Sequence, residues 1–192
     1  MHRLATSFVL GYHGCDEADA ERVLAGAPFK KSENAYDWLG HGVYFWEANP
    51  ERGLAFAKER TKGRGKKRIK KPTVIGAVID LGFCLDLCTT AAVEQIKIAY
   101  SALELTAEAA KGPMPTNSDD QLARNLDCAV IEMLHDVRSL VDDTPIETVR
   151  GIFIEGGPIY PGGGIYEKTH TQICVRNLEN IKGIFRVPTH VI

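Results

Sequence analysis

Three short segments, far apart in the chain, carry the residue types that build a ligand site. They are residues 11–15 (Gly-Tyr-His-Gly-Cys), 39–45 (Leu-Gly-His-Gly-Val-Tyr-Phe) and 169–177 (Thr-His-Thr-Gln-Ile-Cys-Val-Arg-Asn). A histidine offers a ring nitrogen to a hydroxyl group, a tyrosine offers a flat face for stacking, and a glutamine offers an uncharged amide that hydrogen-bonds but cannot act as a base. A neighbouring glycine lets a ligand approach the backbone closely. These types indicate binding by hydrogen bonds and ring stacking.

Each segment lies on or beside a predicted strand. Apolar patterning predicts strands over residues 7–12, 42–46, 73–81, 149–155, 169–175 and 184–187. Helices are predicted over residues 16–25, 50–60, 91–110 and 119–137. Asp16 is the expected N-cap of the first helix, and Asn49 with Pro50 opens the second. Strands around a helical middle favour the α+β class.

The order of the three segments resembles the histidine–tyrosine–glutamate ADP-ribosyltransferases. That group contains the poly(ADP-ribose) polymerases and the diphtheria-type toxins. Its first strand carries His-Gly, its second reads Gly-x-Tyr-Phe, and a late strand opens with a glutamate in the form Glu-x-Ile-Val. The matching residues here are His13-Gly14, then Gly42 to Phe45, then Gln172 to Val175. The resemblance spans about residues 12–184 and leaves the helical middle unmatched.

This resemblance implies a fold and an activity. The expected fold is a single α+β ADP-ribosyltransferase domain over residues 1–192. It would have two packed antiparallel sheets, an NAD cleft between them and a helical insert at about residues 89–141. The expected activity is transfer of ADP-ribose from NAD, with release of nicotinamide. The ribose would pass through an oxocarbenium-like state, as in glycoside cleavage. NAD is the expected substrate, and no metal is expected.

The resemblance also implies roles for individual residues. His13 would hydrogen-bond the adenine-side ribose, and the Gly14 backbone would pair with the nicotinamide carboxamide. Tyr44 would stack on the nicotinamide ring. Phe56 occupies the position of a second stacking tyrosine, and a phenyl ring still offers a π-face. The polymerase serine that contacts the carboxamide aligns with Gly53, so that hydrogen bond is expected to be missing.

The third segment departs most from the family, because Gln172 stands where the family has its glutamate. Some relatives with this fold also carry glutamine here. At an effective dielectric of 20, a charge pair at 4 Å contributes roughly 4 kcal/mol. Losing it could cost on the order of a thousandfold in rate. We therefore expect transfer of a single ADP-ribose unit, or mono-ADP-ribosylation, rather than chain building.

Other residues near these segments are candidates for a role in the chemistry. His170 lies two residues before Gln172 and should share its face of a strand, so we expect it to position or deprotonate the acceptor. Glu155 and Glu167 flank a glycine-rich loop at residues 156–164, and either could replace the missing carboxylate. The loop lacks the Gly-Lys-Ser/Thr ending of a phosphate-binding loop. It is expected to form a rim that shapes the acceptor pocket.

Other interpretations of these residues stay open. His13 could be a polar strand end, Tyr44 and Phe56 could be core aromatics, and Gln172 an ordinary strand residue. Two functional rivals are an NAD glycohydrolase, in which water is the acceptor, and an inactive module that binds NAD or ADP-ribose. A phosphotransferase of the tRNA-splicing type shares the fold, but the arginines it needs are not evident at matching positions.

Charge and composition bound the partners. The expected acceptor is a protein or a nucleic acid. A basic loop over residues 58–71 is either simply solvated or recruits a phosphate-rich acceptor such as RNA or DNA. A small solitary transferase suggests a toxin or defence effector, with an antitoxin as a further partner. The net charge of −2 gives no global attraction to nucleic acid or membrane. No stretch approaches the ~20 apolar residues of a membrane span, so a cytoplasmic protein is expected. Five cysteines without a regular framework read as free thiols.

Overall fold

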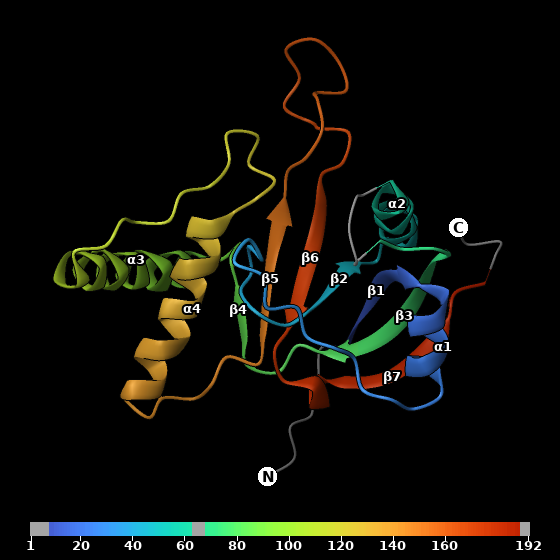
Figure 1. Cartoon of the computed structure of the whole chain (residues 1–192), viewed down its shortest axis with the longest axis horizontal. Helices are drawn as coiled ribbons and strands as arrows, with labels where there is room; N and C mark the ends of the chain where they lie inside the picture. The colour runs from blue at the N-terminus through green and yellow to red at the C-terminus, as the bar shows by residue number, and fades with distance from the viewer. Residues whose placement is uncertain (1–7, 63–67, 189–192) are drawn as a thin grey trace.

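The computed structural model describes residues 8–62 and 68–188, and within them it is an α+β fold (Figure 1). In chain order the elements are β1 (Phe8–Asp16), α1 (Glu17–Leu24), β2 (Val43–Glu47), α2 (Pro50–Thr61), β3 (Pro72–Asp80), β4 (Cys84–Asp86), α3 (Thr90–Ala110), α4 (Asn125–Leu140), β5 (Thr148–Phe153), β6 (His170–Val175), a 3₁₀ turn (Leu178–Asn180) and β7 (Ile181–Arg186). The expected α+β class is confirmed.

The strands form one mixed sheet of seven in the order β4-β5-β6-β2-β1-β3-β7. The prediction of two packed antiparallel sheets was therefore wrong. The two halves are joined because β2 pairs with β6 from Val43↔Val175 to Trp46↔Gln172, and with β1 at Gly11↔Glu47 and Tyr12↔Trp46. The sheet is also not wholly antiparallel, because β4 runs parallel to β5. The three-residue strand β4 was missed, since so short a segment carries little pattern of its own.

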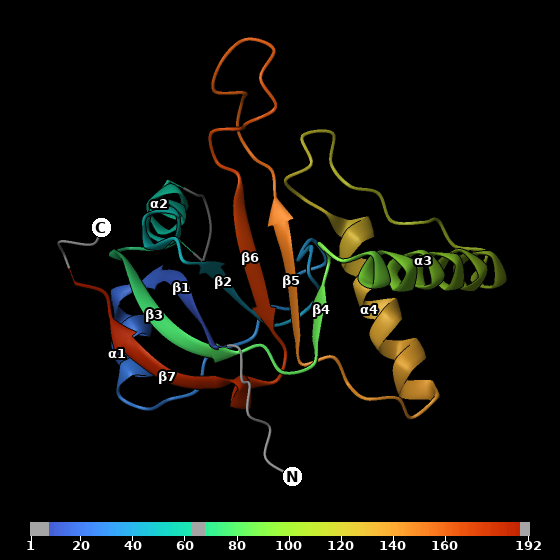
Figure 2. The same cartoon turned by 180° about the vertical axis from the view of Figure 1, so that it is seen from behind.

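The helices form two pairs, one near each end of the strand order (Figures 1 and 2). α1 and α2 lie by β1, β3 and β7, while α3 and α4 lie beyond β4 at the opposite edge. α3 and α4 fall between β4 and β5 in the chain, within the predicted insert of about residues 89–141. The buried residues form two hydrophobic clusters. Because side chains alternate in direction along a strand, Phe45 of β2 and Ile173 of β6 belong to one cluster, and Cys174 of β6 belongs to the other.

The local signals in the sequence explain where the helices begin. Asp16 accepts a hydrogen bond from the Ala18 amide at 3.1 Å, and Asn49 caps α2 through the Arg52 amide at 2.9 Å. The prediction for α4 began six residues early. Residues 119–124 instead form a turn in which Asp120 accepts from Ser118 Oγ and the Leu122 amide.

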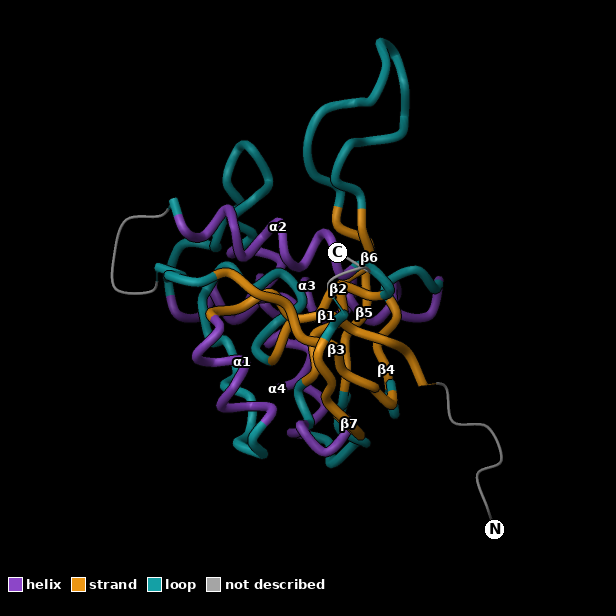
Figure 3. Tube along the Cα trace, turned by 90° about the vertical axis from the view of Figure 1, so that its right-hand side faces the viewer, coloured by secondary structure: helices purple, strands orange, loops and turns teal. Residues whose placement is uncertain are grey.

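The connection between β5 and β6 extends beyond the rest of the molecule (Figures 1 and 3). It contains the glycine-rich loop of residues 156–164. Backbone hydrogen bonds tie its two sides together, from Ile159 N to Ile165 O at 3.0 Å and from Lys168 N to Glu155 O at 3.1 Å. We call residues 154–169 the hairpin loop.

Candidate functional site

A cavity of about 620 Å³ opens where β1 and β2 diverge. The two strands pair only at Gly11↔Glu47 and Tyr12↔Trp46, whereas β1 continues to Asp16 beside β3. The size of the cavity is in the range of small-molecule sites. Of the six residues predicted for the site, the cavity is lined by five, namely His13, Gly14, Tyr44, Phe56 and Gln172, while His170 is not among the residues that line it.

His13 is held by the backbone of the neighbouring strand. Its Nδ1 lies 2.8 Å from the carbonyl oxygen of Tyr44. A carbonyl only accepts, so Nδ1 carries the hydrogen, and in the neutral ring Nε2 is then an acceptor. The ring packs edge-on against Phe29, at 5.4 Å between centroids. Burial lowers the pKa of His13, which favours this neutral form. His13 is thus suited to accept a hydrogen bond from a hydroxyl group.

Tyr44 offers the cavity a ring face but no free hydroxyl. Its Oη accepts from the Leu39 amide at 2.9 Å and donates to the Gly40 carbonyl at 2.8 Å. Burial raises the pKa of Tyr44 well above its ordinary value, so the hydroxyl stays protonated. This arrangement holds the loop before β2, and stacking of the Tyr44 ring on a ligand stays a prediction.

Gly14 and Phe56 bring α2 against the strands. A Cβ added at Gly14 would lie 2.0 Å from the backbone oxygen of Gly53. Close packing of α2 therefore requires glycine at this position, a reason that the sequence interpretation, based on access for a ligand, did not include. The Phe56 ring lines the cavity and also packs against Trp46, with 4.8 Å between ring centroids. Phe56 is therefore partly a packing residue, and its stacking on a ligand stays a prediction.

Gln172 has its side-chain amide oriented by an indole. Its Oε1 accepts a hydrogen bond from Trp38 Nε1 at 2.6 Å. The indole nitrogen only donates, so the amide oxygen must face Trp38, and the amide nitrogen is the group left for a ligand. The strand neighbours of Gln172 are Trp46 on β2 and Gly151 on β5. Neither direct strand neighbour of Gln172 therefore has an ionisable side chain.

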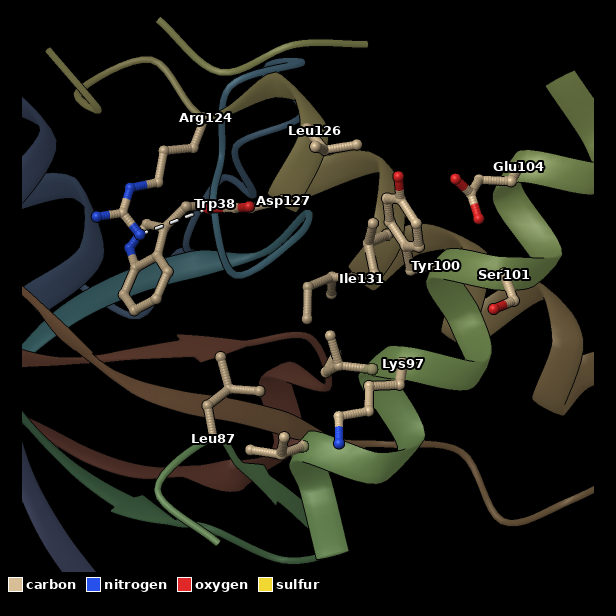
Figure 4. Close-up of a pocket in the computed structure, with 13 residues that line it drawn as sticks. Trp38, Leu87, Lys97, Tyr100, Ser101, Glu104, Arg124, Leu126, Asp127 and Ile131 are labelled. Atoms are coloured by element: carbon tan, nitrogen blue, oxygen red, sulfur yellow. Dashed lines mark hydrogen bonds and ion pairs between the residues drawn. The ribbon is translucent and has the colours of Figure 1, made fainter. Parts of the chain in front are cut away.

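Trp38 was not predicted for the site, because no local pattern connects two residues 134 positions apart. Its ring is 9% exposed and lies under the Arg124 guanidinium, with 5.3 Å from the guanidinium carbon to the ring centre. Trp38 also lines a second cavity of about 690 Å³ between α3 and α4. Figure 4 shows Trp38 and Arg124 on one side of that cavity, facing Ile131 and the residues of α3. Trp38 thus forms a wall shared by both cavities.

His170 lies behind the wall of the first cavity. It is 6% exposed and packs against Phe153 and Trp46, both of which line the cavity. Its Nδ1 bonds to the Lys168 carbonyl, so Nε2 is an acceptor, and within residues 8–62 and 68–188 this atom is buried without a partner. Burial lowers the pKa of His170. His170 shares a strand face with Gln172, as predicted, but it does not line the cavity.

An ion-pair cluster lies at one side of the cavity, with Arg52 and Glu155 largely buried and Lys168 and Glu59 exposed. Arg52 Nη2 donates to Glu155 at 2.7 Å, and Lys168 Nζ lies 3.4 Å from Glu155 and 3.1 Å from Glu59. Burial opposes the ionisation of Glu155, but the hydrogen bond and charge of Arg52, with the charge of Lys168, lower the pKa of its carboxyl overall. The other candidate carboxylate, Glu167, is exposed and does not line the cavity.

The helical insert fixes the loop that enters β2. Glu132 on α4 accepts from the His41 amide at 2.7 Å and pairs with Arg176, whose Nη1 donates to the His41 carbonyl at 3.1 Å. The loop holding Trp38, Leu39 and Gly40 is therefore tied to α4 at its end. His41 serves in this turn and is not part of the cavity wall.

Several other sequence predictions fall outside or beside the cavity. The basic loop predicted over residues 58–71 is described only in part, because residues 63–67 lie outside the described part of the chain. The first four residues of the predicted loop belong to α2. The five cysteines are free thiols. Among the described residues, no cluster of three or more His, Cys, Asp or Glu side chains could hold a metal ion. Within the same residues, each helix is too short or too polar to cross a membrane.

Comparison with known proteins adds no further assignment. No protein-family model matches the chain, and no curated protein sequence shows significant similarity to it.

Proposed function

We propose that this chain transfers a single ADP-ribose unit from NAD to an acceptor and releases nicotinamide. The observation that carries the proposal is the convergence of three separate segments on one cavity. His13 and Gly14 come from β1, Tyr44 from β2, and Gln172 from β6. Phe56 joins them from α2, at the position that the resemblance to the ADP-ribosyltransferases assigns to a second stacking ring.

The groups in the cavity suit the cleavage of a nicotinamide riboside. The Nε2 of His13 would accept a hydrogen bond from a ribose hydroxyl, and the rings of Tyr44 and Phe56 would flank the nicotinamide. Nicotinamide leaves as a neutral ring, so the reaction needs no acid to protonate it. The main requirement is to hold NAD in a reactive geometry and to stabilise positive charge at the ribose.

In this proposal, Gln172 is the reason that only one ADP-ribose unit is transferred to each acceptor site. The amide nitrogen can hydrogen-bond a ribose oxygen, but it neither carries charge nor removes a proton. Extending a chain would require activation of a ribose hydroxyl on the previous unit, and Gln172 has no group for that step. By analogy at the level of the family, we also propose a toxin or defence effector in the cytoplasm, neutralised by an antitoxin.

Nicotinamide release from NAD by the purified protein tests the proposal. We expect release by the wild type and loss of at least about tenfold in Tyr44→Ala and Gln172→Ala, because each removes a group that contacts NAD. Matched controls are Tyr160→Ala and Gln95→Ala, which change residues outside the cavity wall. Both controls should keep wild-type rates.

The result also separates the rival functions. Release without transfer of labelled ADP-ribose to any acceptor would identify an NAD glycohydrolase. NAD binding without release would identify an inactive binding module. Absence of both binding and release would refute the resemblance on which the proposal depends.

A further inference from the structure

The second cavity, between α3 and α4, takes no part in the proposed transfer. Its volume of about 690 Å³ is in the range of small-molecule sites. At one end it is walled by side chains that are almost fully buried, namely Trp38 (9% exposed), Val130 (5%) and Ile131 (3%). At the other end Val93 and Tyr100 of α3 are partly exposed and form its mouth. The cavity thus leads from the surface of α3 to the indole of Trp38 (Figure 4).

The inner end of this cavity accepts only an apolar group. Beside the three buried residues, its wall consists of Leu87, Ile96 and Leu126. Of these six side chains only Trp38 has a hydrogen-bonding group, and its Nε1 already donates to Gln172 at 2.6 Å. A polar or charged group placed there would lose its water without gaining a partner, which is costly. The inner part of a ligand must therefore be an alkyl or aryl group.

The mouth favours an uncharged head group. The charged residues that line the cavity are two of each sign, namely Lys97, Arg124, Glu104 and Asp127. Lys97 pairs with Glu94 at 2.7 Å, and Arg124 pairs with Asp127 at 3.4 Å. A charged head of either sign would lose water and meet a like charge. A hydroxyl group can instead bond to Ser101 or Glu104, which also line the cavity.

An empty cavity beside Trp38 gives this ring room to move. Protein interiors are close-packed, so a buried side chain normally has no second position to occupy. If the indole turned into the cavity, its hydrogen bond to Gln172 would break. A ligand that fills the space fits only the arrangement in which Trp38 stays in the wall, and it therefore stabilises that arrangement. Binding in this cavity would thus hold Gln172 in its orientation.

We propose that this cavity binds a small uncharged molecule with an alkyl or aryl body and a hydroxyl head, and that binding activates nicotinamide release by holding Trp38 against Gln172. The ligand site is independent of the proposed function, whereas the activation rests on it. Trp38 separates the two cavities, so the ligand and NAD bind at the same time.

Three probes with the same eight-carbon chain test the ligand class: 1-octanol, octanoate and octylamine. Each is titrated into the full chain by isothermal titration calorimetry. We expect saturable binding of 1-octanol, at least about tenfold tighter than binding of the two charged probes, because their charge would be partly desolvated at the mouth. Saturating NAD should leave 1-octanol binding in place.

A variant at the mouth tests the location. Val93→Phe places a larger ring at the entrance and should weaken 1-octanol binding at least about tenfold. Ile98→Phe, on the same helix, is the matched control, because Ile98 is 65% exposed and does not line the cavity. It should keep wild-type affinity. A melting curve of each variant verifies folding.

Two measurements test the coupling through Trp38. The indole N–H of Trp38 gives one of two tryptophan signals in an NMR spectrum, which Trp38→Phe assigns. Exchange of this N–H with solvent should slow when 1-octanol binds. Saturating 1-octanol should also raise kcat for nicotinamide release by up to about tenfold, the fold change that one net hydrogen bond gives. Neither Val93→Phe nor Gln172→Ala should show this activation.

Other outcomes overturn the inference. The site is wrong if 1-octanol does not bind saturably, if a charged probe binds more tightly, or if NAD displaces 1-octanol. Unchanged binding in Val93→Phe would place the probe elsewhere, and a dimer that this variant dissociates would show that a second copy of the chain fills the cavity. Binding without slower indole exchange would refute the coupling. Absence of nicotinamide release would refute the proposed function, while calorimetry and exchange would still decide the ligand site.

Discussion

At the scale of single residues, hydrogen bonds to backbone and indole groups decide what the cavity offers. His13 presents an acceptor because the Tyr44 carbonyl takes its Nδ1 hydrogen, and Gln172 presents a donor because Trp38 takes its amide oxygen. Without the hydrogen bond from Trp38, the side-chain amide of Gln172 could turn either its oxygen or its nitrogen toward the cavity. Trp38 is therefore a positioning residue for Gln172 in the proposed reaction.

Trp38→Phe removes this hydrogen bond and keeps an aromatic ring in the wall. A hydrogen bond contributes about 0.5–1.5 kcal/mol, so we expect kcat for nicotinamide release to fall by up to about tenfold. KM for NAD should change by less than the rate. In a Gln172→Ala background the same replacement should have little further effect. An equal loss in both backgrounds would mean that Trp38 acts through packing alone.

Glu155→Gln distinguishes an electrostatic role from a catalytic one. The change removes a negative charge beside Arg52, 2.7 Å away, and keeps the side chain's shape. We expect nicotinamide release to persist within a few-fold of wild type, because the proposed cleavage needs no base at this position. If Glu155 is a general base, release would instead drop on the order of a hundredfold. Steady-state kinetics of nicotinamide release decides between the two, with a melting curve to verify folding.

At the scale of elements, the cavity exists because β1 and β2 pair over a short stretch and then separate. Beyond Tyr12↔Trp46, β1 follows β3 alone, and α2 packs on it with Gly53 against Gly14. The insert secures the other side, where Glu132 and Arg176 hold the loop before β2. Contacts with α2 and pairing with β3 thus keep the part of β1 that leaves β2 in place.

Gly14→Ala should disrupt the contact between β1 and α2. The added Cβ would lie 2.0 Å from a backbone oxygen, which cannot rotate away as a side chain could. We expect the free energy of unfolding to fall by about 1–3 kcal/mol, the usual range for overpacking. Gly183→Ala on β7 is the matched control, since a Cβ there meets nothing within 4 Å. Urea unfolding of both variants measures the difference; equal midpoints would contradict close packing at Gly14.

At the scale of the whole molecule, buried histidines make the free energy of unfolding depend on pH. Burial lowers the pKa of His13 and His170 below the ordinary 6.5, and that of His135, on α4, to about 4. The unfolded chain therefore takes up protons at a higher pH than the folded protein does. Stability rises with pH wherever the unfolded state binds more protons.

We expect the free energy of unfolding to be constant between about pH 7 and pH 7.5 and to fall as the pH decreases from 6.5 toward 4. Urea midpoints at pH 7.5, 6, 5 and 4.5 measure the effect. His135→Gln should flatten the decline, because this position then cannot bind a proton in either state. A midpoint that stays level down to pH 4.5 would contradict the burial of these rings.

The sequence by itself determined the α+β class and the positions of most helices and strands. These features follow from local rules: Asn49 with Pro50 starts a helix, and alternating apolar residues form strands. The resemblance to the ADP-ribosyltransferases, and not a local rule, singled out five of the residues that line the cavity. Only the tertiary structure decided that β2 joins the strands into one sheet, that His170 lies behind the wall, and that Trp38 orients Gln172. Strand order, burial and hydrogen bonds between distant residues depend on how elements pack, and a glycine such as Gly14 carries no sign in the sequence of the helix that packs against it.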